Sequence, residues 1–222
     1  MTVLHLADEG EAADLAAFLS RLLHYDRGAA VRLQAAGTAL AVFGRPPSFE
    51  VLAVRAVRLA KPYEDGLDVT LDVTVSAGEL LESVDEKGAT AVVPGAVTGP
   101  PWAGVLPPRG GWRAEPGLPA PDALRSLVAS SVAEFRSRTQ ELPAERRTRA
   151  ELDGIGRDIW SRTVGATRLP VRAVHAAQSL GFLRPGVPPA LFSSGAWLRL
   201  RTPYGSVAVR QAGLGALDVS VR

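Results

Sequence analysis

The chain has 222 residues, of which 46% are hydrophobic and 22% are charged, and its formal net charge is +2. This composition is typical of a globular protein with a sizeable core and excludes an intrinsically disordered chain. So small a net charge also argues against a protein that coats nucleic acid. Arginine carries nearly all the positive charge, since Lys61 and Lys87 are the only lysines. This bias is typical of a GC-rich, actinobacterial-like genome.

The sequence contains no cysteine, which excludes disulfides, thiolate catalysis and Cys-ligated metal sites. The N-terminal residues lack the basic and apolar regions of a signal peptide. The longest uncharged run, residues 88–108, has too many prolines and glycines to cross a membrane as a helix. We therefore expect a cytoplasmic protein without a membrane segment.

The first half of the chain predicts one helix followed by a β-meander. Apolar residues recur at helical spacing over residues 11–25, and the three strands are expected near 31–34, 38–43 and 49–59. Arg55 and Arg58 have opposite parity in the third strand. That strand is therefore either bulged or packed on both faces.

The most regular stretch of the sequence is residues 67–84. Five apolar side chains alternate with polar ones, and a period of two places all five on one face of a strand. The strand leads directly into a short helix, because Ser76 and Glu79 have the spacing of a capping box. This stretch predicts an antiparallel sheet with one covered and one open face. The five alternating residues are Leu67, Val69, Leu71, Val73 and Val75.

The second half predicts three helices and a hairpin. The first helix begins near Pro121, the second spans 144–164 and the third spans 170–180. The hairpin has strands at 197–202 and 206–210, joined by a Pro203–Gly205 turn. A last short strand is expected at 217–221. The order helix, short strand, strand, strand occurs in residues 11–57 and again in 170–210, either as an internal repeat or because antiparallel folds reuse hairpins.

Residues 94–121, here named the strap, contain eight prolines and six glycines. Such a segment can be an interdomain linker, but Trp102 and Trp112 favour an ordered segment packed across the fold. We predict one α+β domain over residues 1–222, with a mostly antiparallel sheet and helices packed on one face. The strap then lies between an N-terminal lobe (1–93) and a helical plus hairpin C-terminal lobe (122–222).

No motif for nucleotide binding, metal binding or nucleophilic catalysis is present. The three histidines, His5, His24 and His175, lie far apart in sequence. Asp68 and Asp72 share a strand face, but about 13 Å separates residues four apart in a strand, which is too far for paired glycosidase carboxylates. We assign no catalytic residue, no metal ligand and no cofactor.

The residue types favour a non-enzymatic protein-interaction or regulatory module whose partner is another protein. Trp102, Arg109 and Trp112 are the candidate partner-binding residues, because tryptophan and arginine dominate interface hot spots. The alternative for the two tryptophans is that they anchor the strap to the sheet.

Two further functions stay open. The helices at 144–164 and 170–180 followed by a hairpin are similar to a winged helix-turn-helix, a DNA-binding fold. This resemblance implies that Arg172, His175 and Ser179 face the DNA groove. It also implies that basic residues of the hairpin lie near the wing, namely Arg199, Arg201 and Arg210. The third alternative is an enzyme assembled from dispersed residues.

Overall fold

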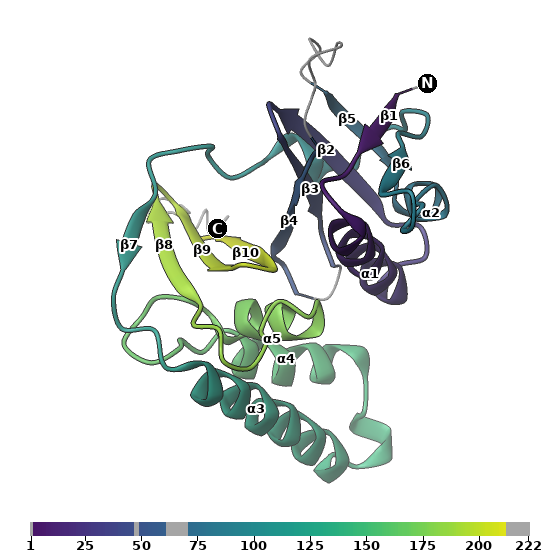
Figure 1. Cartoon of the computed structure of the whole chain (residues 1–222). Helices are drawn as coiled ribbons and strands as arrows, with labels where there is room; N and C mark the ends of the chain where they lie inside the picture. Colours follow the sequence, from purple (N-terminus) through teal and green to yellow (C-terminus); the bar gives the residue numbers. More distant parts are fainter. Residues whose placement is uncertain (1, 47–48, 61–70, 212–222) are drawn as a thin grey trace, which may run out of the picture.

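The computed structural model describes residues 2–46, 49–60 and 71–211 and has an α+β fold with a mostly antiparallel sheet, as predicted (Figure 1). No helix in these ranges is long and apolar enough to cross a membrane. The helices are α1 (Glu9–Tyr25), α2 (Ala77–Glu82), α3 (Pro121–Glu141), α4 (Arg149–Trp160) and α5 (Val171–Ser179). The strands are β1 (Val3–His5), β2 (Ala30–Ala36), β3 (Ala39–Gly44), β4 (Leu52–Arg58), β5 (Asp72–Ser76), β6 (Thr90–Val92), β7 (Arg113–Glu115), β8 (Ala190–Ser194), β9 (Trp197–Thr202) and β10 (Gly205–Arg210).

The described strands form an eight-stranded sheet in the order β5-β2-β3-β4-β10-β9-β8-β7, and β1 pairs with β6 beside it. The order is symmetrical about the central contact of β4 with β10, which pair antiparallel. Helix α1 precedes the meander β2-β3-β4, and α5 precedes the meander β8-β9-β10. Of the two explanations for the repeated order of elements, this arrangement favours an internal repeat.

Local signals account for the N-terminal elements. Asp8 caps α1, since its side chain accepts a hydrogen bond from the backbone N–H of Glu11 at 2.9 Å. The apolar stripe of α1 is buried as its spacing predicts. Ser76 caps α2 in the same way, accepting from Glu79 N at 3.4 Å. Of the predicted strand 67–76, residues 67–70 lie outside the described ranges, and β5 covers the rest from Asp72.

The C-terminal hairpin is confirmed with β10 starting one residue earlier than predicted, at Gly205, and its turn requires glycine. Gly205 has a φ of 154°, and a Cβ there would lie 2.5 Å from the ring of Phe182. The single helix predicted over 144–164 is wrong in its bounds. Thr148 caps α4 by accepting from Glu151 N at 3.3 Å, so the segment breaks into a 3₁₀ turn (Ala144–Arg146) and α4. The strand expected at 217–221 lies outside the described residues.

The two faces of the sheet are buried by different means. The helices cover one face over a large core that includes Leu33, Leu40 and Val57. The opposite face carries a small cluster of four buried side chains, Phe43, Leu52, Val54 and Ala208. Strand β4 contributes to both clusters, so of the two predicted possibilities it is packed on both faces.

Candidate functional site

The strap lies across the open face of the sheet, here named the strap face. It begins beside β5, where Val97 N donates to Thr74 O at 2.9 Å. A 3₁₀ turn at Pro101–Gly104 follows, and Arg32 of β2 donates to the carbonyl of Ala103 in this turn. Trp102 and Leu106 pack against the small apolar cluster. The strap then crosses to the other end of the sheet, where β7 pairs with β8 (Figure 1).

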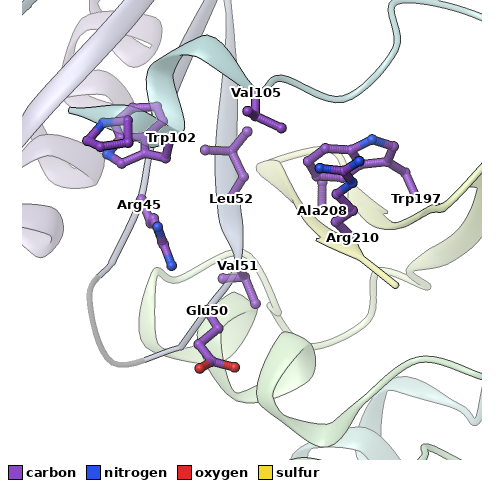
Figure 2. A pocket seen from close by; sticks show the side chains of 10 residues that line it. Arg45, Glu50, Val51, Leu52, Trp102, Val105, Trp197, Ala208 and Arg210 are labelled. Carbon is purple, nitrogen blue, oxygen red and sulfur yellow. The ribbon is translucent and has the colours of Figure 1, made fainter. Parts of the chain in front are cut away.

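A groove is left between the strap and the hairpin β9-β10. It encloses a cavity of about 360 Å³, a volume in the range of ligand-binding pockets. Figure 2 shows Trp102 and Trp197 on opposite sides of Leu52 and Val105. Leu52 and Ala208 are paired across β4 and β10 and line the groove from the sheet. The lining is therefore mainly apolar.

A second cavity of about 400 Å³ lies next to the groove and shares Trp102 and Arg45 with it. Each cavity is bordered by an exposed valine of the strap. Val97 lines the second cavity with 39% of its surface exposed, and Val105 lines the groove with 48% exposed. Large apolar side chains exposed beside cavities are typical of a contact surface.

Charged residues stand at the rim of the groove. Arg45 follows β3, and Arg210 lies directly opposite Trp197 in the β9–β10 register. Within the ranges that the structure describes, neither arginine forms an ion pair. Glu50 is the one carboxylate among the groove residues, and its Oε2 lies 4.0 Å from Arg172 Nε. Its φ of 50° is unusual for a residue other than glycine.

The structure separates the three predicted partner-binding residues. Trp102 lines the groove, whereas Trp112 lies further along the strap. The indole Nε1 of Trp112 donates to Pro108 O at 3.0 Å, and the guanidinium of Arg199 lies 5.6 Å from its ring centroid. Arg109 is exposed between them. The groove is instead lined by Trp102 together with Trp197. From the sequence, Trp197 was predicted only as part of the hairpin.

Alternation in β9 could have placed Trp197 on the open face. Leu198 and Leu200 are buried under the helices, so Trp197, Arg199 and Arg201 must point to the strap face. The pairing of β10 with β4, however, cannot be predicted from the sequence. That long-range contact brings Trp197 next to Leu52 and the strap.

The six residues of the DNA-binding alternative do not form one surface. Helix α5 packs between the sheet and the helices α3 and α4, and most of its residues are buried. Arg172, His175 and Ser179 belong to this helix. The hairpin residues lie on the opposite face of the sheet, namely Arg199, Arg201 and Arg210.

His175 is enclosed by aromatic rings. Its imidazole stacks on Trp160 with a centroid distance of 4.5 Å and meets the edge of Phe49 at 5.0 Å. Burial lowers the pKa of His175, so the ring is neutral near pH 7. A neutral aromatic ring between two others is packing rather than a basic contact for phosphate.

Among the described residues, the most buried charge lies at the contact between the two halves of the sheet. Arg55 of β4 is 4% exposed. It donates to Glu11 at 2.9 Å and Asp14 at 3.2 Å on α1, and to Tyr204 O at 2.8 Å in the β9–β10 turn. The cluster joins α1, β4 and the hairpin. In the described part of the chain no three His, Asp or Glu side chains are placed to hold a metal ion.

Two family models match successive parts of the chain. Residues 1–104 match the model described as Domain of unknown function (DUF8010), and residues 107–214 match Domain of unknown function (DUF8185). The two matches meet inside the strap. No match was found among curated proteins.

One solved structure with a similar fold is the DNA polymerase sliding clamp from Pseudomonas aeruginosa. The TM-score is 0.50 at 13% sequence identity, and the match covers 98% of this chain. The chain spans 66% of the length of the clamp chain. At this identity the likeness concerns the fold alone.

Proposed function

We propose that this protein is a non-enzymatic protein-interaction module whose groove binds a short apolar segment of a partner protein. The observation that carries the proposal is that Trp102 and Trp197, from the strap and the hairpin, line one mainly apolar cavity. Tryptophan is the residue most enriched in interface hot spots, because its large ring excludes water from the contact. Both indoles are half-buried, so part of each ring remains available to a partner.

The groove is held in shape by the fold. Leu52 and Ala208 belong to neighbouring strands of the central sheet, and the strap is held by backbone hydrogen bonds and by its contact with Arg32. A preformed site loses less conformational entropy on binding than a mobile one. Pro100 and Pro101 before Trp102 restrict the strap in the same sense.

The similar fold supports an interaction role without naming a partner. The name of the similar structure, DNA polymerase sliding clamp, includes the name of a second protein. A similar fold therefore occurs in a protein whose name links it to another protein. The likeness does not extend to that partner.

Selection of random peptides displayed on phage tests the proposal. Peptides that bind the wild-type chain are expected to lose at least about tenfold in affinity for Trp197→Ala or Val105→Gln. Trp112→Ala is the matched control, since Trp112 lies on the same face outside the groove, and its affinity should change less than about twofold. Thermal melts establish that each variant is folded. If no peptide is selected, or if the selected peptides bind all variants equally, the groove is not the interaction site.

A further inference from the structure

We infer that the partner segment which binds in the groove is acidic as well as apolar, with carboxylates that pair with Arg45 and Arg210. The inference rests on the proposed function and adds the charge of the ligand. It starts from the distribution of charges on the strap face. The register places Arg199, Arg201 and Arg210 on this face, because their neighbours Leu198, Leu200 and Val209 belong to the opposite core.

The strands of the strap face are poor in carboxylates, and the carboxylates that line the two cavities, Glu50 and Asp26, lie in loops. Among the described strands, the register places only Asp72 there, and Arg32 already binds both of its oxygens, with Arg32 Nε 2.7 Å from Oδ1. The hydrogen bond from Arg32 is the main reason that the pKa of Asp72 is lowered. No carboxylate of the described strands is left on this face for the hairpin arginines.

On the helix side of the sheet, arginines form ion pairs with carboxylates of the described residues. Arg162 donates to both oxygens of Glu134, at 2.6 and 2.8 Å, and Arg138 also pairs with Asp158. These pairs link α3 to α4 and to Arg162 just after it. On the strap face, Arg199 donates to the hydroxyl of Ser206 at 2.9 Å and to no carboxylate of the described residues. Its pKa is lowered, first by burial and then by the charge of Arg201. The field on the strap face therefore favours an anion.

The position of the arginines defines how such an anion binds. Arg210 is exposed beside Trp197, and Arg45 is exposed beside Trp102. A segment with its apolar side chain over Leu52 has an arginine within reach on either side. Arg45 also lines the second cavity. A longer partner segment that extends past Trp102 into this cavity still places one of its carboxylates next to Arg45.

The aliphatic lining favours a protein segment over a nucleic acid, which arginine and tryptophan also bind. Leu52, Val105 and Ala208 offer no hydrogen-bond partner through their side chains. A nucleobase placed over them loses the hydration of its polar edges without compensation. A leucine or phenylalanine side chain gains from the same contact. Acidic residues then add attraction at the rim.

The peptide selection gives the test. Peptides selected on the wild-type chain are expected to be enriched in Asp and Glu next to an apolar residue. Arg45→Gln and Arg210→Gln should each weaken their binding about two- to fivefold, and added salt should weaken it further. Arg136→Gln and Arg157→Gln are matched controls, because these exposed arginines on α3 and α4 lie away from the groove and should leave affinity unchanged.

A charge-reversed chain separates charge from packing. Selection on the double variant Arg45→Glu and Arg210→Glu is expected to yield peptides rich in Lys and Arg. Peptides that need Trp197 but show no acidic preference would overturn this inference and leave the proposed function standing. Failure to select any peptide would overturn both. Arginine-dependent binding of single-stranded oligothymidylate, in place of peptides, would identify the ligand as nucleic acid and overturn both as well.

Discussion

The two faces of the sheet differ in how they bury apolar groups and in how they place charge. On the helix face, a continuous core runs under α1, α2, α3 and α5, and the buried Arg55 has two carboxylate partners. On the strap face, four buried side chains support a single extended segment, and the hairpin arginines have no carboxylate partner among the described residues. The helix face therefore holds most of the buried core, while the strap face keeps apolar surface and positive charge accessible.

Arginines on the two faces give the largest expected contrast. Arg55→Met removes the buried cation that Glu11 and Asp14 share and leaves Glu11 paired with the exposed Arg58, and should lower the free energy of unfolding by about 3 kcal/mol. Arg199→Met removes a charge that has no carboxylate partner among the described residues, and should cost about 1 kcal/mol or less. Denaturant melts measure both. A similar loss for the two variants would show that the strap face depends on its arginines for folding.

Two buried leucines of adjacent strands sharpen the comparison for packing. Leu40→Ala in β3 opens a cavity in the closed core, and should cost about 2–5 kcal/mol. Leu52 in β4 already borders the groove, so truncation there enlarges an existing cavity and should cost about 2 kcal/mol or less. Chemical unfolding of both variants decides the matter. If Leu52→Ala is the more damaging change, the strap face belongs to the core.

The strap itself offers a smaller contrast. Trp112→Ala removes the indole that bonds to Pro108 and lies near Arg199, and should cost about 1–2 kcal/mol. Arg109 is exposed, and Arg109→Ala should leave the melting temperature unchanged. Loss of peptide binding in Arg109→Ala would place the interface at the tip of the strap, as the tryptophan pattern of the sequence suggests, rather than in the groove.

Local patterns predicted most of the fold. The stripe of α1, the alternation into β5 and the hairpin β9-β10 are each specified by residues close in sequence. The three-residue strands β1, β6 and β7 were not predicted, because three residues carry no recognisable period. Their pairing depends on partners far along the chain, such as Val92 opposite Val3. The helix predicted over 144–164 was wrong in its bounds, because Thr148 caps α4 and residues 144–148 carry no apolar stripe.

The site was predicted only in part. Trp102 could be singled out, because a large aromatic residue in a Pro-rich segment needs a packing partner. Trp197 and Arg210 could not be joined to it, since their proximity follows from the contact of β10 with β4. The DNA-binding alternative relied on the spacing of two helices and a hairpin. Spacing does not reveal that the apolar side chains of α5 are buried on several sides.

Titration of His175 has the smallest expected effect on the free energy of unfolding. It tests whether the imidazole on the helix face is harder to protonate in the folded chain than in the unfolded one. Burial between Trp160 and Phe49 holds the pKa of His175 below its ordinary value of about 6.5. At pH values between the folded and unfolded pKa, the unfolded chain binds more protons than the folded one, so stability falls as the pH falls. The contribution is fully present above about pH 6.5 and is lost as the pH drops through the folded pKa.

His175→Phe keeps the ring stack and removes the titration. The free energy of unfolding of the wild type should therefore fall more steeply with acidification than that of the variant, when both are measured by denaturant melts at a series of pH values. Parallel curves would mean that the imidazole takes up a proton in the folded chain as easily as in the unfolded one, and that water reaches this side of the sheet.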